Sequence, residues 1–403
     1  MSINDTLQQA VRCHQAGQLQ EAAKLYRSIL QIQPDQPEAN HNLGLLAMQM
    51  GQPASGLPYF YLQNAWKADP QREQFCLTLT ECLLRMGRSG DALQLIKNAM
   101  QQKSFNSPQA SRLLQLATSI VANERPSLLR EHELFTLFGA GQFAALEEQL
   151  THLLNQCTNW GAGWDMLCTV LQIQGKDSES ALERAMQLMP GNADALGNQR
   201  KVFCIGANKT GTTSVEHVLR NLGLAVGNQA QAEMLIHDWA RRDYRRIIRY
   251  CQSAQAFQDV PFSLPGTFKV LDDAFPGSKF ILTIRKSADE WFESMVRFHT
   301  KIVGKGRIPT ADDLRQYNYR YPGYVLDVLR LSYGADKSTL YNREVYVQYY
   351  EDHNSQVIEY FKARPDDLLV LNNEEPDAME RLVKFLGYQY TGQKMPHLNV
   401  SKG

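Results

Sequence analysis

A chain of 403 residues is long enough for two or three domains, each with its own hydrophobic core. Its 42 basic residues balance its 42 acidic residues, and this zero net charge argues against nucleic acid or an anionic membrane as the main partner. Apolar residues make up 43% of the chain and charged residues 21%, which is typical of an ordinary globular protein.

The N-terminal segment has no charged region followed by an apolar one, so we expect no secretory signal. No stretch approaches the roughly 18 apolar residues of a membrane span. The seven cysteines are odd in number and form no C-x-x-C pair, which predicts neither a disulfide framework nor a zinc site. These features together predict a cytoplasmic protein without a bound metal.

The first half of the chain contains an internal repeat. Glycines recur at 34 or 36 residues within two groups, which are Gly17, Gly51, Gly87 and then Gly141, Gly175. An alanine lies five residues after two of them, and a large apolar residue lies nine residues after four of them: Ala22, Ala92; Tyr26, Phe60, Ile96, Leu150. Prolines follow the second helix of several units: Pro34, Pro70, Pro190. Glycine permits a tight turn between helices, and proline ends the second helix.

This pattern resembles the tetratricopeptide repeat (TPR), a helix–turn–helix unit of about 34 residues. The best-formed units are 4–37, 38–71, 72–104 and 160–193, and the segment 105–159 is degenerate in pattern. We therefore expect TPR-like helical repeats over 1–122 and further helical repeats over 123–197. Stacked repeats would offer a groove to a protein or peptide partner, whereas a generic helical bundle, the alternative, would not.

From about residue 200, short apolar runs alternate with longer helical patterns, which predicts an α/β domain over 198–403 with a central parallel sheet. The expected strands are Val202–Gly206, a run near Ala254–Gln258, Lys279–Arg285 and Asp367–Asn372. Ligands of such sheets bind beyond the carboxyl ends of the strands. The residues that follow each strand are therefore the candidates for the chemistry.

The first expected strand leads into a glycine-containing turn, a run of hydroxyl side chains and a helix. Backbone N–H groups and the dipole at a helix N-terminus bind anions, and Lys209 adds a full positive charge. A Walker A loop would place its lysine directly after the second glycine, but here Lys209 precedes Gly211. The alternatives are another phosphate ligand or a purely structural turn.

The run Lys209, Thr210, Gly211, Thr212, Thr213, Ser214 resembles the 5′-phosphosulfate loop K-[ST]-G-[ST]-[ST]-S of sulfotransferases that use 3′-phosphoadenosine 5′-phosphosulfate (PAPS). The resemblance implies a three-layer, P-loop-type α/β fold over about 200–403. It also implies that these six residues bind PAPS and that Lys209 acts in catalysis. The product would be adenosine 3′,5′-bisphosphate.

The third expected strand ends in Arg285, whereas a Walker B strand ends in a magnesium-binding aspartate. An arginine suits a phosphate site without metal, because its guanidinium binds phosphate through two N–H groups. The resemblance implies that Arg285 and a serine on the next helix, Ser294, contact the 3′-phosphate. Ser294 lies nine residues after Arg285 instead of the usual eight. A surface salt bridge and a helix-surface position are the alternatives for these two residues.

The second expected strand leads to Asp259, the position from which sulfotransferases often deprotonate the acceptor. We therefore predict Asp259 as the general base, which requires a pKa raised by burial. The alternative is a carboxylate that caps the turn at Pro261. His237 is the competing base, although a lone histidine is more often structural.

Two further segments have weaker patterns. The C-terminal stretch 395–403 resembles the loop that closes over PAPS, with Lys402 within reach of a phosphate, or else a frayed end. The aromatic segment Tyr317–Tyr350 would build the acceptor pocket or its lid, or belong to the core.

The sequence as a whole predicts an enzyme that transfers a sulfuryl group from PAPS to a hydroxyl acceptor by in-line displacement. A glycan, a peptide tyrosine, a lipid or a small alcohol would each serve as acceptor. Two other functions stay open, namely a P-loop nucleotide kinase or ATPase and a TPR scaffold with an inactive nucleotide-binding fold. Magnesium-dependent ATP binding would favour the first, and failure to bind any adenosine phosphate the second.

Overall fold

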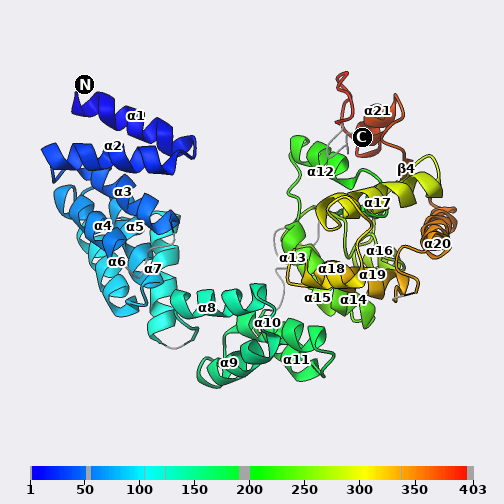
Figure 1. Cartoon of the computed structure of the whole chain (residues 1–403), viewed down its shortest axis with the longest axis horizontal. Helices are drawn as coiled ribbons and strands as arrows, with labels where there is room; N and C mark the ends of the chain where they lie inside the picture. Colours follow the sequence, from blue (N-terminus) through cyan, green and yellow to red (C-terminus); the bar gives the residue numbers. More distant parts are fainter. Residues whose placement is uncertain are drawn as a thin grey trace. The chain divides into compact units, whose positions relative to one another are not determined.

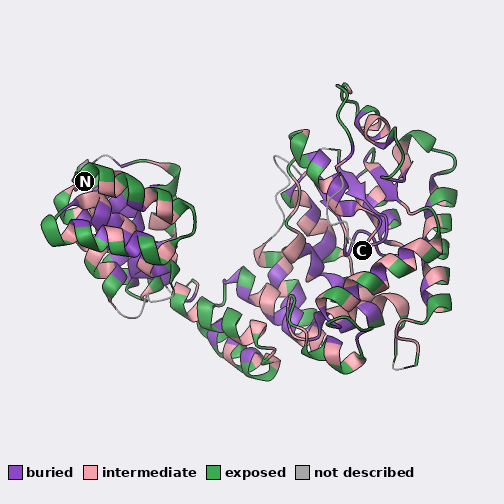
Figure 2. Cartoon of the chain, turned by 45° about the horizontal axis from the view of Figure 1, so that its top comes forward, coloured by how far each residue is buried: buried purple, intermediate pink, exposed green. Residues whose placement is uncertain are grey.

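The computed structural model describes residues 2–50, 56–103, 105–122, 124–189, 200–336 and 338–396. The chain divides into two compact units (Figure 1), Met1–Leu137 with Glu148–Trp160, and Phe138–Glu147 with Gly161–Gly403. Within each unit the buried side chains lie on the helix faces that meet their neighbours and around the sheet (Figure 2).

The first unit is built from helices that pack in consecutive pairs, as the repeat predicts. Its helices are α1 (Ile3–Gln15), α2 (Leu19–Ile32), α3 (Pro37–Gln49), α4 (Leu57–Ala68), α5 (Glu73–Arg85), α6 (Ser89–Lys103) and α7 (Pro108–Val121). The degenerate segment continues as helices, with α7 followed by α8 (Leu128–Gly139) and α9 (Phe143–Gln156). Gly51 and Pro190 lie outside the described residues.

The turn glycines have the predicted structural role, and the apolar residues nine positions after them differ in burial. The turn glycines Gly17 and Gly87 both have a φ of 74°, a conformation that favours glycine. Ala22 and Tyr26 are fully buried between the helices. Phe60, at the same repeat position as Tyr26, is 56% exposed. Other residues of α4 supply its buried face, namely Pro58, Leu62 and Ala65.

The second unit has a four-stranded, all-parallel sheet in the order β2-β1-β3-β4. The strands are β1 (Val202–Cys204), β2 (Ala256–Gln258), β3 (Lys279–Thr283) and β4 (Leu368–Leu371), so each predicted strand is confirmed. The longer helices are α10 (Gly161–Ile173), α11 (Glu179–Leu188), α12 (Thr212–Asn221), α16 (Thr267–Ala274), α17 (Ala288–Ile302), α19 (Tyr324–Tyr333), α20 (Arg343–Phe361) and α21 (Ala378–Phe385). The shorter ones are α13 (Gln229–Glu233), α14 (Ile236–Ala240), α15 (Arg245–Tyr250) and α18 (Ala311–Gln316).

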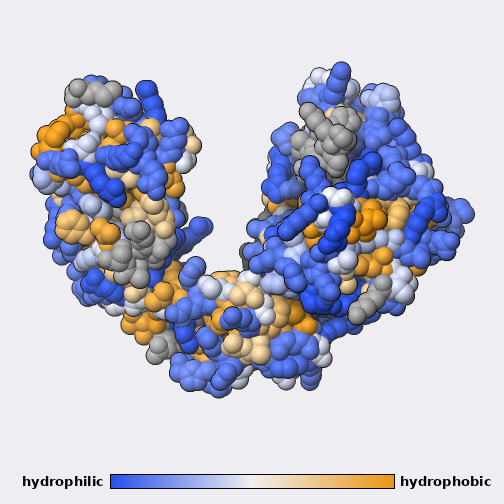
Figure 3. Space-filling view, viewed as in Figure 1, coloured by the Kyte–Doolittle hydropathy of each residue, from blue (hydrophilic) through white to orange (hydrophobic). Residues whose placement is uncertain are grey.

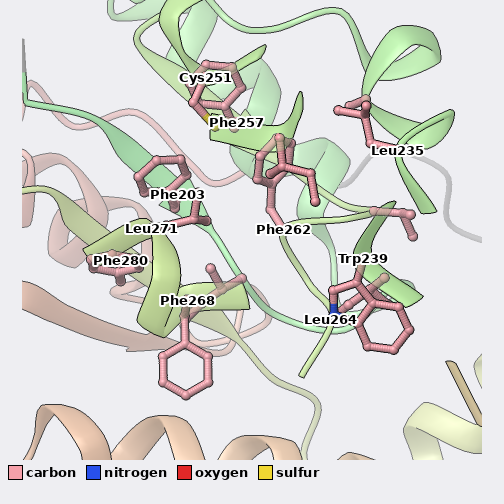
Figure 4. Packing of buried hydrophobic residues seen from close by; sticks show 14 of the residues in the cluster. Phe203, Leu235, Trp239, Cys251, Phe257, Phe262, Leu264, Phe268, Leu271 and Phe280 are labelled. Carbon is pink, nitrogen blue, oxygen red and sulfur yellow. The ribbon is translucent and has the colours of Figure 1, made fainter. Parts of the chain in front are cut away.

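Successive side chains of a strand point to opposite faces of the sheet. Apolar side chains therefore leave both faces, and helices cover both. On one face, Phe203 packs against Phe257 and Phe280 with ring centroids 5.7 and 5.5 Å apart (Figure 4). On the other face, Val202 and Cys204 pack with residues of α12 and α21. The predicted fold, a helical-repeat region followed by an α/β domain with a parallel sheet, is confirmed.

The helix pair α10 and α11 belongs to the second unit, and the buried Arg246 joins α10 to the rest of that unit. Arg246 of α15 is 2% exposed and forms ion pairs of 3.0 Å with Asp165 of α10 and 3.1 Å with Asp238 of α14. Its Nη2 also donates a hydrogen bond of 2.7 Å to the hydroxyl of Thr169. Among the helices that the structure describes, none is both long and apolar enough to cross a membrane.

Candidate active site

The loop after β1 is fixed tightly against the end of β3. A Cβ atom on Gly206 would lie 2.1 Å from Oγ1 of Thr283 and 2.5 Å from its backbone nitrogen, so only glycine fits there. Thr210 donates a hydrogen bond of 2.6 Å to the carbonyl oxygen of Ala207, and its hydroxyl lies 2.6 Å from that of Thr283. These contacts set the course of the loop toward α12.

The second glycine of the loop begins the helix. Gly211 precedes α12 with a φ of 98°, and its carbonyl oxygen accepts a hydrogen bond of 2.8 Å from the side chain of Asn373, which follows β4. A Cβ atom on Gly211 would lie 2.2 Å from that amide nitrogen. Thr212 and Thr213 occupy the first turn of α12, where the unpaired backbone N–H groups of a helix N-terminus bind anions.

Lys209 is a desolvated cation at the centre of this loop. Its backbone is in the left-handed region, with a φ of 72°, which is uncommon for a residue other than glycine. Its ammonium lies 3.1 Å from the centroid of the Phe298 ring and forms no ion pair with a described residue. Burial lowers its pKa, whereas the carboxylates of Asp259 and Glu233 act in the opposite direction. A cation in this state favours an anionic ligand.

Asp259 directly follows β2, the neighbour of β1 in the sheet, and also has a left-handed backbone, with a φ of 65°. Its carboxylate accepts a hydrogen bond of 2.9 Å from the backbone N–H of Val260. Burial raises the pKa of this carboxyl group, and the charge of Lys209 opposes that rise. Non-glycine residues in such backbone conformations cluster at functional sites.

The side chains of Lys209 and Asp259 line one cavity of about 140 Å³. Three tyrosines of the predicted aromatic segment also line it, namely Tyr319, Tyr324 and Tyr333. Others of that segment, such as Tyr346 and Tyr350, are buried in the core instead. The rest of the wall consists of Asn208, Glu233, Val260, Met295, Phe298, His299, Ile302, Val325, Val328 and Leu329.

Glu233, which the sequence did not single out, is a second buried carboxylate in the cavity. It is 6% exposed and accepts a hydrogen bond from the guanidinium of Arg320. Burial and the nearby charge of Asp259 raise the pKa of Glu233, while Arg320 lowers it. No motif surrounds Glu233 in the sequence, so no pattern was available to find it.

The two histidines of this region are both engaged in hydrogen bonds with tyrosines. Nε2 of His237 lies 2.9 Å from the hydroxyl of Tyr321, and His237 is absent from the described residues that line the cavity. His299 does line it, and its Nδ1 lies 3.0 Å from the hydroxyl of Tyr341. Burial lowers the pKa of each histidine to about 4, so both are neutral near pH 7. His299 falls in a stripe of pocket-lining residues along α17, a helical spacing visible in the sequence: Met295, Phe298, His299, Ile302.

Arg285 lies against the loop, as its position after β3 predicts. Its Nε donates a hydrogen bond of 2.9 Å to the carbonyl oxygen of Lys209, and its Nη1 forms an ion pair of 2.7 Å with Glu374. Ser294 is half-buried on α17, one helical turn before Phe298, whose ring contacts Lys209. Lys402 lies outside the described residues.

Comparison with family models gives two matches. A model described as a sulfotransferase domain matches residues 201–403, which is half of the chain, and a model described as a TPR repeat matches residues 12–51. The predicted combination of TPR repeats and a sulfotransferase domain is thus confirmed. A search of curated proteins finds no match.

Several solved structures are similar to parts of the chain. A structure of pilF from Pseudomonas aeruginosa shares 16% identity, with 68% of this chain and 93% of that chain covered and a TM-score of 0.29. YrrB, a TPR protein with an unusual peptide-binding site, shares 13%, with 46% and 85% covered and a TM-score of 0.28. A mutant O-GlcNAc transferase from Thermobaculum terrenum shares 14%, with 96% and 98% covered and a TM-score of 0.28.

Proposed function

The chain belongs to the sulfotransferase domain family, and on this premise we propose that it transfers a sulfuryl group from PAPS to a hydroxyl acceptor. The observation that carries the proposal is the cavity shared by Lys209 and Asp259, at the carboxyl ends of the neighbouring strands β1 and β2. Lys209 forms no ion pair with a described residue, which suits an anionic donor, and the raised pKa of Asp259 suits the deprotonation of a hydroxyl acceptor.

The residues around the loop fit the two anionic ends of PAPS. The first-turn N–H groups of α12, the hydroxyls of Thr212, Thr213 and Ser214, and the ammonium of Lys209 would hold the phosphosulfate end. Thr210 would fix the loop around it through its hydrogen bond to Ala207. The guanidinium of Arg285, which contacts the same loop, and the hydroxyl of Ser294 would hold the 3′-phosphate. PAPS supplies a sulfuryl group already bonded to a good leaving group.

In this reaction the protein removes the proton of the acceptor hydroxyl and stabilises the negative charge that develops on the leaving group. As the acceptor oxygen bonds to sulfur, the bond between sulfur and the 5′-phosphate oxygen breaks, and Asp259 takes the acceptor proton. Lys209 and the N–H groups of α12 stabilise the negative charge that develops on the departing adenosine 3′,5′-bisphosphate. His237 is unsuited to the role of base, because its ring is held by Tyr321.

The repeats of the first unit would bind a protein or peptide partner, which is the usual role of the groove in TPR arrays. All seven cysteines of the chain are free, and this supports a reducing compartment such as the cytoplasm.

Thermal unfolding with adenosine 3′,5′-bisphosphate tests the donor. Without magnesium, this nucleotide at 100 times its Kd should stabilise the protein by about 2.7 kcal/mol, and ATP should do much less because it lacks the 3′-phosphate. The Lys209→Ala variant should lose most of that stabilisation and most of the turnover of labelled PAPS. A larger effect of ATP that requires magnesium would refute the proposal in favour of a nucleotide kinase or ATPase.

A further inference from the structure

The wall of the cavity divides into a polar part and an apolar part. Its polar side chains come mainly from the loops after β1 and β2. Helices α17 and α19 supply most of the apolar part, through Met295, Phe298, Ile302, Val325, Val328 and Leu329. The face of the second unit shown in Figure 3 is largely hydrophilic with small apolar patches, so this lining is not a general property of the unit's surface.

The size of the cavity matches one aromatic ring. Its volume is about 140 Å³. An apolar cavity of roughly 150 Å³ in another protein holds benzene. The tyrosine rings that line this cavity offer further contact surfaces for a ring. The hydroxyl of Tyr324 donates a hydrogen bond of 3.2 Å to the carbonyl oxygen of Glu233. Tyr324 would therefore contact a ligand through its ring.

Several polar groups of the cavity already have partners among the described residues. Glu233 is paired with Arg320, and His299 is hydrogen-bonded to Tyr341. The side-chain oxygen of Asn208 accepts a hydrogen bond of 3.2 Å from the hydroxyl of Ser263. A sugar ring would bury hydroxyls without partners here, which is unfavourable, whereas a ring with one hydroxyl needs a single polar contact.

We infer that the acceptor is a phenol whose ring lies between α17 and α19 and whose hydroxyl points toward Lys209 and Asp259. This inference rests on the proposed function and narrows it from any hydroxyl to an aromatic one. The phenol would belong either to a tyrosine side chain of a peptide or to a free small molecule. The phenol oxygen bonds to sulfur, the bond from sulfur to the 5′-phosphate oxygen breaks, and the phenolic proton goes to Asp259.

The acidity of a phenol agrees with the base that the site offers. A tyrosine hydroxyl has a pKa of about 10, whereas water, a guide to an aliphatic hydroxyl, has a pKa of about 15.7. A carboxylate accepts a proton from a phenol more readily than from an alcohol. Burial raises the pKa of Asp259, which makes it a stronger base than an exposed carboxylate.

The test compares acceptors with the full chain and labelled PAPS. The phenols are 4-nitrophenol and a peptide with one tyrosine, and their matched controls are methyl glucoside and the same peptide with serine in place of the tyrosine. At least one phenol should have a kcat/KM about 100-fold or more above its control. A higher value for 4-nitrophenol than for the tyrosine peptide would identify a free phenol as the source, and the reverse order a tyrosine side chain.

Variants at Val328 then locate the ring. Val328→Phe fills the cavity and should lower kcat/KM for 4-nitrophenol by about 10-fold or more, while stabilisation by adenosine 3′,5′-bisphosphate is retained. Val328→Ala enlarges the cavity and should raise the activity on 2-naphthol relative to 4-nitrophenol. Arg297→Gln, at an exposed position of α17, is the control that should change neither value.

Failure of the proposed function and failure of the phenol inference give different results. If adenosine 3′,5′-bisphosphate fails to stabilise the protein, the proposed function is wrong and the inference falls with it. If the nucleotide stabilises the protein but neither phenol is sulfated, or the glucoside or serine peptide is the better acceptor, the phenol inference alone is overturned.

Discussion

Some of the side chains that line the cavity could be predicted from the sequence, and others could not. Lys209 and Asp259 follow buried strands, and neighbouring parallel strands bring their carboxyl ends to one edge of the sheet, so their proximity could be predicted. Glu233 lies at the end of the five-residue helix α13, which has no strand or motif beside it. Its place in the cavity depends on long-range packing and on the ion pair with Arg320.

Substitution of the proposed base should separate chemistry from binding. Asp259→Asn keeps the size of the side chain but cannot accept the acceptor's proton, so turnover should fall by about 100-fold or more. Its affinity for adenosine 3′,5′-bisphosphate should stay within a few-fold. Steady-state kinetics and calorimetric titration measure the two effects. If His237→Gln causes the loss of turnover and Asp259→Asn does not, the base is assigned wrongly.

The same variant should be more stable than the parent at neutral pH. Because burial raises the folded-state pKa of Asp259, the folded chain binds a proton there more tightly than the unfolded chain does. The native charge therefore costs stability above that raised pKa, and the cost disappears below the ordinary value of 3.8, where both states are protonated. Thermal unfolding from pH 4 to pH 8 should show a gain for Asp259→Asn that shrinks as the pH falls. An equal difference at all pH values would contradict a raised pKa.

At the scale of elements, the strands were predictable and several helices were not. Strands β1 and β3 are short, mostly buried apolar runs, and β4 is an apolar run of intermediate burial. The turns that follow the strands are visible in the sequence. Helices of five or six residues, such as α13, α14 and α18, are too short for a helical period to be recognised. Repeat spacing alone does not determine which face of α4 is buried, because Phe60 keeps the spacing and is exposed.

The end of β3 offers a test of the 3′-phosphate site. Arg285→Ala should weaken the binding of adenosine 3′,5′-bisphosphate by about 10-fold or more, the scale of a lost charge-assisted contact. Binding of adenosine 5′-phosphosulfate, which has no 3′-phosphate, should hardly change. Calorimetric titration of both nucleotides measures the difference.

Glu374→Gln provides the matched comparison. The carboxylate of Glu374 lies 2.7 Å from the guanidinium of Arg285 and 3.0 Å from the ammonium of Lys286, where it competes with an incoming phosphate. Its neutralisation should tighten the binding of adenosine 3′,5′-bisphosphate by a few-fold. Equal losses for both nucleotides in Arg285→Ala would mean that Arg285 only supports the loop through the carbonyl of Lys209.

At the scale of the whole molecule, the sequence predicts a sulfotransferase domain that begins near residue 198. The compact unit that contains the sheet also includes Phe138–Glu147 and the helices α10 and α11. Arg246 joins these helices to α14 through Asp165 and Asp238. The ion pair with Asp165 links residues 81 positions apart, and no local sequence pattern predicts it. We propose that α10 and α11 stabilise the catalytic unit even though they have the sequence of a repeat.

Arg246→Met in the full chain tests that proposal. Asp238 is fully buried, and removal of its partner from a buried ion pair costs about 3–5 kcal/mol of unfolding free energy. The double variant Arg246→Met, Asp238→Leu removes both charges and should recover much of that loss. Denaturant unfolding, followed with and without adenosine 3′,5′-bisphosphate, measures the free energies of the three proteins.

Truncation extends the same argument to the two units. A chain that begins at Ser127 keeps α8 to α11, and we expect it to bind adenosine 3′,5′-bisphosphate with nearly the affinity of the full chain, because every proposed nucleotide contact lies beyond residue 200. A chain that begins at Asn198 keeps Asp238 but lacks Asp165, the partner of Arg246 on α10. It also loses the packing of α10 against the rest of the unit, so it should unfold at a lower temperature or aggregate. Equal stability and equal binding in the two truncated chains would show that the catalytic unit needs no helix of the repeat region.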